Sequence, residues 1–333
     1  MIPLIRPARL DDLPHLLRFS KVRASGITSL PENEKLLAQN LDHSQASFAN
    51  GGDPLEEALY VFCLQYGKRV IGVSAIKTAI GKSSPFFMYH LTSQMQKCTH
   101  LNLKYELEIL DFQTINSLPT EIGSLFLERT HRKKHFGRLL SYARFLLMAN
   151  FPTHFSTVIL AQLRGVNTNG HSPFWDAVGN KFFGVTFDQA EHLRADHPDI
   201  VAELFPRSRI YPAMLPKKAQ DVIRVPHKNT VPARLLLEKE GFQISPYCDI
   251  FDAGPHMYAA RDSIKAVKDS KVKKLRIQPL INKLDNCLVA NTHLDFRATI
   301  APVQVLDDEI MLQKEIATLL EVEEGESVRY LEL

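Results

Sequence analysis

Apolar positions in the first part of the chain recur with the period of either a strand or a helix, and the change of period marks the predicted elements. Gly67 lies between two apolar runs and predicts the turn of an antiparallel hairpin. Residues 81–120 mix serine, proline and glutamine with short apolar groups, and they predict no definite element. The elements predicted before residue 80 are a strand at 2–6, a helix from Asp11 through Phe19, a loop followed by a helix within 20–50, and a hairpin of strands at 60–65 and 70–78.

After residue 120 the same patterns predict alternating strands and helices. Gly241 follows one helical pattern directly, as glycine does where a helix ends. The lysines between 265 and 274 predict a linker or an exposed helix. The predicted strands are 125–127, 157–163, 242–251, a group within 287–305, and 327–333; the predicted helices are 137–149, 232–240 and 307–320. This succession predicts a mixed sheet with helices on both faces, in the α+β (α/β) class.

Composition narrows the class of protein. The chain has 333 residues, of which 45% are hydrophobic and 23% charged, so it is long enough for one large domain with an appendage or for two domains. A net charge of +3 without a basic stripe argues against a nucleic-acid-binding protein. No apolar run approaches the roughly 20 residues of a membrane helix, and the N-terminus lacks the order of a secretion signal. We therefore expect a cytoplasmic protein with no membrane partner.

The four cysteines predict neither a disulfide framework nor a zinc site, because they are scattered and form no C-x-x-C pair. His131 and His135 lie four residues apart at the start of a predicted helix, but cations surround them and no carboxylate or thiolate set accompanies them. We expect no metal site.

The stretch from 125 to 149 combines a short apolar strand, a basic turn and an amphipathic helix. Backbone N–H groups and the positive end of the helix macrodipole converge at such a turn, so it can hold a diphosphate without a metal ion. Gly137 allows a ligand to approach the backbone closely, and full positive charges surround it. A basic, solvated start of a helix is the alternative explanation of the charges. The predicted phosphate-binding residues are Arg132, Lys133, Gly137 and Arg138, with Lys134 beside them.

Several segments resemble the GCN5-related N-acyltransferase superfamily, whose members bind acyl-coenzyme A. These segments are IRPARLDDLPHLL, the hairpin, the strand that leads into RKKHFG, and PARLLLEKEGF. Longer strings spread over nearly the whole chain resemble the arginine N-succinyltransferase family. These strings are ITSLPENE, TEIGSLFL, RGVNTNGHSPFW, AELFPRSRIYP, DVIRVPHKNTVPARLLLEKEGF and IFDAGPH.

The resemblance implies a GNAT-type mixed, mostly antiparallel sheet flanked by helices, with a large insertion at 164–229 that builds the acceptor site. We expect an acyltransferase domain at 1–261 and a small β-rich C-terminal appendage at 262–333, which would serve oligomer contacts or cover the site. The implied reaction transfers the succinyl group of succinyl-CoA, a co-substrate rather than a permanently bound cofactor, to the α-amine of L-arginine. A homo-oligomer is compatible with this. The alternatives are a non-catalytic acyl-CoA or amino-acid sensor, another acyl group, or another acceptor such as ornithine.

The resemblance also implies particular site residues. Leu125, Phe126 and Leu127 correspond to the strand that pairs with the pantetheine arm, and His227 in VPHKN corresponds to the proton donor. Position alone would make His227 a surface or capping residue. The superfamily carries R-x-x-G-x-G, whereas His135 stands here where the first glycine is expected. Its β-carbon would push the loop away from the diphosphate unless the local φ is negative.

The chemistry of the acceptor suggests further candidates, because arginine carries a guanidinium that a carboxylate can bind and an α-carboxylate that donors can bind. His171 is the competing histidine, although it can equally belong to a packed aromatic corner. Arg164 can instead bind the carboxylate of the succinyl group. The candidates are Ser29, Glu32, Arg164, His171 and Asp249, followed by Glu34, Arg209 and Asp252.

Overall fold

The computed structural model describes residues 1–333 with the exception of 22–29, 52, 54, 133–134, 197–199, 206 and 280–285. Contacts between residues divide the chain into two compact units. Unit 1 consists of Met1–Ala79, Ile122–Ile159 and Ala260–Leu333, and unit 2 consists of Ile80–Glu121 and Leu160–Ala259. The predicted boundary between 261 and 262 stays a prediction.

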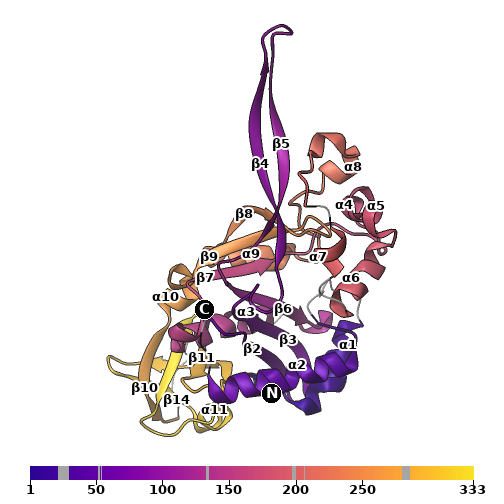
Figure 1. Cartoon of the computed structure of the whole chain (residues 1–333). Coiled ribbons are helices and arrows are strands. Elements are labelled where there is room, and N and C mark those ends of the chain that lie inside the picture. Colours follow the sequence, from indigo (N-terminus) through magenta and orange to yellow (C-terminus); the bar gives the residue numbers. More distant parts are fainter. Residues whose placement is uncertain are drawn as a thin grey trace. The chain divides into compact units, whose positions relative to one another are not determined.

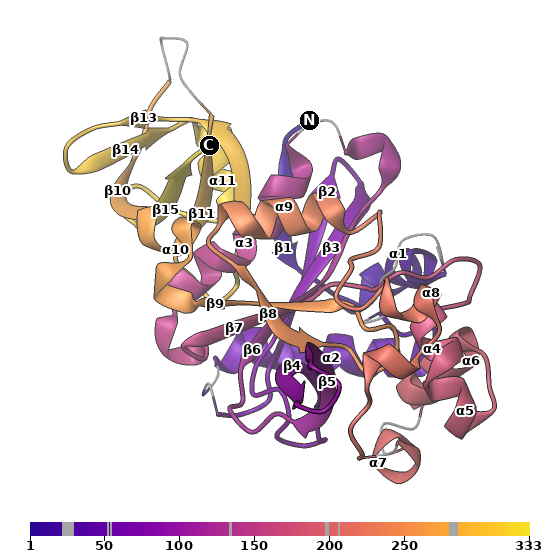
Figure 2. The ribbon, with the colours of Figure 1, turned by 90° about the horizontal axis from the view of Figure 1, so that it is seen from above.

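Unit 1 contains most of the strands. Their order is β13-β14-β10-β15-β11-β12-β1-β2-β3-β6, and all pairings described here are antiparallel except that between β10 and β14. Figure 2 shows the C-terminal strands gathered around α11. The elements are β1 (Pro3–Pro7), η1 (Leu10–Asp12), α1 (Leu13–Ser20), α2 (Glu34–Asn50), β2 (Leu59–Tyr66), β3 (Arg69–Lys77), β6 (Thr120–Leu127), η3 (Arg129–His131), α3 (Phe136–Asn150), η4 (Pro152–His154), η6 (Arg261–Ser263), α10 (Lys265–Asp269), β10 (Lys271–Ile277), β11 (Asn286–Asn291), β12 (Ala298–Pro302), β13 (Gln304–Val305), β14 (Glu309–Leu312), α11 (Lys314–Leu320) and β15 (Ser327–Glu332).

Strand β3 is buried on both faces, because successive side chains of a strand point to opposite sides. Val73 and Ala75 belong to the apolar cluster that includes side chains of α1 and α2. Ser74 points to the other face, where its hydroxyl donates to the carbonyl of Leu140 in α3 at 3.1 Å. A β-carbon at Gly72 would lie 2.8 Å from the carbonyl oxygen of Phe126, so glycine permits β6 to pack closely. The helices therefore cover both faces, as the sequence predicts.

Unit 2 carries the strands β7-β9-β8-β4-β5, in that order, and a group of short helices. Figure 1 shows β4 and β5 as a long two-stranded ribbon. The elements are β4 (Phe87–Cys98), β5 (Leu103–Thr114), β7 (Val158–Gln162), α4 (Pro173–Ala177), α5 (Gly179–Phe183), α6 (Phe187–Asp196), α7 (Ile200–Leu204), η5 (Pro212–Met214), α8 (Lys217–Gln220), α9 (Val231–Lys239), β8 (Gln243–Cys248) and β9 (Pro255–Ala260). The unit boundary falls within β6, β7 and β9.

Trp175 forms the centre of the core of unit 2. Its ring is fully buried and stacks on Phe251 with a centroid distance of 5.0 Å and an interplanar angle of 3°. Its indole N–H donates to the carbonyl of Val185 at 2.9 Å, so the one polar atom of the ring is paired. Gly179 lies against the ring, and a β-carbon there would come within 2.2 Å of Trp175 Cε3.

The predicted fold class is confirmed, and most predicted elements exist. The hairpin forms with Gly67 at φ +63°, and the strand at 2–6 and the helix after Asp12 are present. Among the described residues no helix is long and apolar enough to cross a membrane.

Three predicted elements differ from the structure. The strand predicted at 242–251 ends at Cys248, because the Asp249 carboxylate accepts the N–H groups of Phe251 and Asp252 and forms a turn. The helix predicted at 307–320 begins only at Lys314, since residues Glu309–Leu312 pair with β10. Of the two alternatives for the lysine-rich stretch, the helix is confirmed at Lys265–Asp269, whereas Lys271–Ile277 forms strand β10, which neither alternative predicted.

The contact between Gly179 and Trp175 yields a stability prediction. Gly179→Ala should lower the free energy of unfolding by about 1–3 kcal/mol, because the new methyl group overpacks a core that cannot shift the indole. Urea denaturation measures the change. Gly137→Ala is the matched control, since the nearest atom to its β-carbon is 3.9 Å away. Equal free energies of unfolding of the two variants would show that the core around Trp175 accommodates the methyl group, and would contradict the prediction.

Candidate active site

The N-terminus of α3 in unit 1 presents unpaired backbone donors. The first bond within the helix runs from the N–H of Leu139 to the carbonyl of His135 at 3.0 Å, and the side chain of His135 caps no N–H group. The N–H groups that precede Leu139 in the helix are therefore oriented outward, as in anion-binding helix starts. Gly137 lies within this turn, and only Leu127 Cδ2, at 3.9 Å, is near the position of a β-carbon. The protein's own packing thus does not require glycine at this position.

His135 adopts the left-handed conformation, with φ 58° and ψ 2°. The negative φ under which its β-carbon would be tolerated is therefore not present. The position needs a positive φ, which explains why a glycine would be favoured here, and histidine is one of the residue types that tolerate this region. The side chain of His135 is exposed.

Basic and apolar side chains surround this turn. The Arg132 Nε donates to the carbonyl of Leu127 at 3.1 Å, and the Arg138 guanidinium lies 5.9 Å from the ring centroid of Tyr142. Phe126 and Leu127 are buried, so only the backbone of this part of β6 can face a ligand. Ser124 has a φ of +51°, which marks an irregularity in β6 immediately before Leu125. Lys133 and Lys134 lie outside the described residues.

His227 in unit 2 is held by its backbone on both sides. Its N–H donates to the carbonyl of Arg164 at 2.8 Å, and its carbonyl accepts the N–H of Thr230 at 2.8 Å. An isolated β-bridge between Gly165 and Pro226 supports the same segment. The histidine therefore has a fixed position just before α9.

The ring of His227 has a defined hydrogen-bonding state. Its Nδ1 accepts the backbone N–H of Asn229 at 3.1 Å, so the neutral ring carries its proton on Nε2. Burial lowers the pKa of His227 below its ordinary value, and the positive charges of Arg164 and Lys228 lower it further. At neutral pH the ring is a neutral imidazole that presents an N–H donor.

Asp252 connects the segment of Arg164 to the turn before β9. One carboxylate oxygen accepts the N–H of Gly165 at 2.7 Å, and the other accepts the N–H of Gly254 at 2.8 Å. A β-carbon at Gly165 would lie 2.4 Å from the Asp252 carbonyl oxygen, and one at Gly254 would lie 2.2 Å from the carbonyl oxygen of Leu163. The two glycines of the strings RGVN and DAGPH are thus required by close backbone approach.

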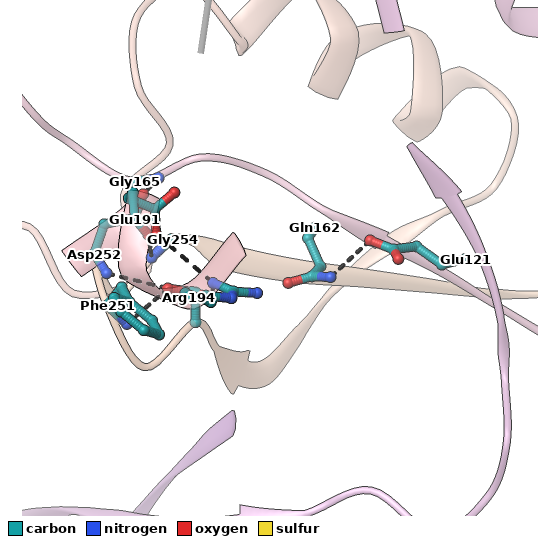
Figure 3. Close-up of polar contacts among 9 residues, drawn as sticks. Glu121, Gln162, Gly165, Glu191, Arg194, Phe251, Asp252 and Gly254 are labelled. Carbon is teal, nitrogen blue, oxygen red and sulfur yellow. Dashed lines mark hydrogen bonds and ion pairs between the residues drawn. The ribbon is translucent and has the colours of Figure 1, made fainter. Parts of the chain in front are cut away.

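A cluster of charges lies beside this connection (Figure 3). The Arg194 guanidinium is 3.4 Å from the Asp249 carboxylate and 3.8 Å from that of Glu191, and it lies 4.9 Å from the ring centroid of Phe251. Figure 3 also shows a separate hydrogen bond of 2.6 Å, from Gln162 Nε2 to Glu121.

Two carboxyl groups of this cluster, those of Glu191 and Asp252, have raised pKa values, so their ionised forms are disfavoured. Burial raises the pKa of Glu191 to about 6, although Arg194 lowers it. Burial and the neighbouring Asp249 raise the pKa of Asp252 well above the usual range of an aspartate, against the effect of its two N–H bonds. The carboxylates of Asp249, Glu191, Glu121 and Asp252 all act on the charge of Arg194, and an additional cation would be stabilised here.

Arg164 of unit 2 has a buried Nε that finds no hydrogen-bond partner among the described residues, a feature that it shares with Arg224. No carboxylate of the described residues forms an ion pair with Arg164. It acts at longer range, since its charge lowers the pKa values of both Glu191 and His227. Arg209, by contrast, is paired with Asp111 at 2.8 Å.

Comparisons with known proteins agree on one family. A family model described as arginine N-succinyltransferase beta subunit matches residues 3–266, and the model of its C-terminal domain matches residues 271–332. This chain belongs to that family. An arginine N-succinyltransferase of Enterobacter sp. (strain 638) and one of Escherichia coli (strain 55989 / EAEC) are each 34% identical to it, over 99% of this chain and 97% of theirs.

A solved structure is also similar over the full length. The arginine/ornithine succinyltransferase subunit AI of Pseudomonas aeruginosa has a TM-score of 0.89 and 29% sequence identity, and the match covers 99% of this chain and 98% of that one. The resemblance found in the sequence is therefore confirmed at the level of the family and of the fold.

The acceptor candidates occupy different surroundings, and their roles stay predictions. Asp249 lies in the cluster around Arg194, whereas Glu32 is an exposed residue of unit 1. His171 is exposed beside Asp176 and is not packed in an aromatic corner, because Phe174 and Trp175 are the buried residues there. Ser29 lies outside the described residues.

The sequence reasoning did not find Glu191 and Arg194. They lie three residues apart on α6, a spacing that places both on one face of a helix, and this spacing was the available signal. His256 is a further buried group: burial lowers its pKa to about 4, and neither ring nitrogen has a partner among the described residues. No group of three possible metal ligands occurs in the part of the chain that the structure describes.

Proposed function

We propose that this protein transfers the succinyl group of succinyl-CoA to the α-amine of L-arginine. Membership of the family supports the reaction, and the observation that carries the mechanism is the fixed Nε2–H of His227. A neutral amine attacks the thioester carbonyl and forms a tetrahedral intermediate with an ammonium and an oxyanion. The ammonium gives up one proton, collapse then forms the amide and breaks the carbon–sulfur bond, and the departing thiolate takes up one proton, so that the products are the amide and the free thiol of CoA.

The N-terminus of α3 would bind the diphosphate of the co-substrate. The outward N–H groups and the macrodipole supply a positive field, and Arg132 and Arg138 add charge near it. The space beside Gly137 is compatible with a ligand group, since among the described side chains only Leu127 Cδ2, at 3.9 Å, lies near the position of a β-carbon. Leu125 and its neighbours in β6 would pair with the pantetheine arm through their backbone.

His227 would act as a neutral hydrogen-bond donor. Accepting a proton at Nδ1 would replace the hydrogen bond from Asn229 by a contact between two N–H groups, so the ring is poorly suited to act as the base for the amine. Its Nε2–H can stabilise the negative charge that develops on the sulfur or on the oxyanion. An α-amine with a pKa near 8 is partly neutral at physiological pH without a strong base.

The guanidinium of the acceptor would bind at the cluster of Glu191 and Asp249. Both carboxylates lie within 3.8 Å of the Arg194 guanidinium, and the pKa of Glu191 stays raised by burial although Arg194 and Arg164 lower it, which supports a site with room for further positive charge. A substrate guanidinium would provide the missing positive charge. The name of the Pseudomonas aeruginosa relative includes ornithine, which makes ornithine a second candidate acceptor. Rates of thiol release with each amino acid distinguish the two.

The phosphate-binding assignment predicts an effect of a single side chain. Gly137→Val should weaken binding of succinyl-CoA at least about tenfold, which corresponds to ~1.4 kcal/mol, because the side chain occupies the space beside the helix start. Isothermal titration calorimetry measures the affinity. Succinyl-pantetheine, which lacks the diphosphate, is the control and should bind both proteins equally. Equal loss for both ligands would place the diphosphate elsewhere.

The assignment of His227 predicts both a rate and a pH profile. His227→Ala should lower turnover by about 10²-fold or more, whereas His227→Gln, which keeps an N–H donor, should lose less. The pKa of His227 is lowered, so the neutral ring is already present at and above pH 6.5. We therefore expect kcat/KM to rise with pH towards the pKa of the acceptor amine, without a fall between pH 6 and 7. A descending limb in that range would mean that the imidazolium is the active form.

The unpaired guanidinium of Arg164 predicts recognition of a substrate carboxylate. Arg164→Met should lower kcat/KM with succinyl-CoA by about 10–150-fold, the range expected for a charged hydrogen bond, and leave that with butyryl-CoA unchanged. Butyryl-CoA is the matched control, because it carries a methyl group where succinyl-CoA carries its terminal carboxylate. If the variant instead loses the distinction between L-arginine and L-argininamide, Arg164 binds the α-carboxylate. Equal effects on all four substrates would refute a carboxylate contact.

A further inference from the structure

The outer half of the β4–β5 ribbon in unit 2 is uncovered. Figure 1 shows it as a long extension, and the residues from Ser93 to Gln94 and from Leu101 to Glu106 are exposed. Large apolar side chains are among them: Met95 is 51% exposed, Leu103 51% and Tyr105 53%. A two-stranded ribbon with both faces in water is only marginally stable, so this region gains from a partner that covers it.

Strand β5 also has a free edge. It is the last strand in the order of the sheet, and β4 is its neighbour on the inner side. Leu110 forms a bridge with Ile210, with hydrogen bonds of 2.8 and 3.0 Å in the two directions. Between Leu103 and Ile109 no described strand lies on the outer side. Such an edge exposes N–H and C=O groups that can pair with another chain.

The sequence of this edge alternates with the period of a strand. Leu103, Tyr105, Leu107 and Ile109 point to one face, and Lys104, Glu106 and Glu108 point to the other. The β5 side chains on one face are thus apolar, and the outer two, Leu103 and Tyr105, are about half exposed. The β5 side chains on the other face carry charges of both signs. Lys104 lies directly opposite Lys97 of β4, a like-charged pair that destabilises the isolated ribbon.

We propose that β5 pairs with β5 of a second copy of this chain, antiparallel and about a two-fold axis at Tyr105. An isologous contact of this kind extends the sheet across two copies, and the same residues serve on both sides. The axis at Tyr105 places Lys104 opposite Glu106 of the second copy, twice by symmetry, and Leu103 opposite Leu107. The basic residue then meets an opposite charge that its own ribbon does not offer.

The charges select this register. An axis at Glu106 would place the two Glu106 side chains opposite each other, and an axis at Lys104 would do the same with the two lysines. An axis at Glu106 would still pair Lys104 with Glu108 twice, but it adds the repulsive contact at the axis. Of the three positions, only the axis at Tyr105 forms two attractive pairs without placing like charges directly opposite each other. The pattern LKYELEI is therefore self-complementary only about Tyr105 among these three positions.

A cysteine at the axis tests the register. Residues directly opposite in an antiparallel pair have Cα atoms about 4.5–5.5 Å apart, within the range of a disulfide. In a Cys98→Ser background, Tyr105→Cys should form a covalent dimer under mild oxidation, seen on a non-reducing gel. Glu108→Cys in the same background is the matched control and should stay uncrosslinked. A monomer with both, or a dimer with Glu108→Cys alone, would overturn the proposed pairing.

Charge reversal tests the same contact without a covalent bond. Lys104→Glu and Glu106→Lys should each convert the dimer to a monomer in light scattering coupled to size exclusion, because each creates two like-charged pairs. The double variant restores both attractive pairs and should be dimeric again. Wild-type protein that is monomeric, or single variants that stay dimeric, would refute the interface. Thiol release by the single variants reports on the transferase reaction separately, since none of these residues belongs to the proposed active site.

Discussion

The buried carboxylate of Asp252 is the constraint on which the candidate site of unit 2 depends. It joins the segment that follows β7 to the turn that precedes β9, through the N–H groups of Gly165 and Gly254. Arg164, next to Gly165, then holds His227 through a backbone hydrogen bond. Leaving a buried partner of such a bond unpaired costs about 1–3 kcal/mol, so the connection is hard to loosen locally. The position of His227 thus depends on a buried carboxylate of another segment, Asp252.

The start of α3 depends on a backbone conformation rather than on a buried carboxylate. A turn that directs several N–H groups outward needs a residue with positive φ, and this chain uses His135 where glycine would be the least costly choice. Its side chain points to solvent, so the conformational cost does not obstruct the turn. Gly137 inside the first turn has no such conformational reason and no packing reason, and helical glycine is unfavourable by about 1 kcal/mol relative to alanine. On the proposed assignment, the diphosphate of the co-substrate is the reason for its presence.

The sequence predicted those parts of the fold in which a buried face imposes a regular period. Strand β3 and helix α3 are examples, since both pack against a core over most of their length. Strands β4 and β5 were missed because their outer halves have no core in the chain, and the polar residues of β4 show no alternation. The strand after α9 was predicted too long because a side-chain turn at Asp249, rather than a glycine or proline, ends it. For the site, Asp249 could be named from its chemistry, but Glu191 and Arg194 belong to no motif and gain their meaning only beside Asp249 and Phe251.

The charges around Arg194 connect the proposed acceptor site to proton uptake. A carboxylate whose pKa is raised binds a proton in the folded protein over a pH range in which it would be ionised in the unfolded chain, so stability falls as the pH rises through that range. Glu191, with a pKa of about 6, and Asp252 both behave in this way. A guanidinium placed among them would lower both pKa values, because an opposite charge favours the ionised form. On the proposed assignment, binding of arginine therefore replaces protons that the empty site retains, and the same burial that raises these pKa values makes the cluster selective for a cation.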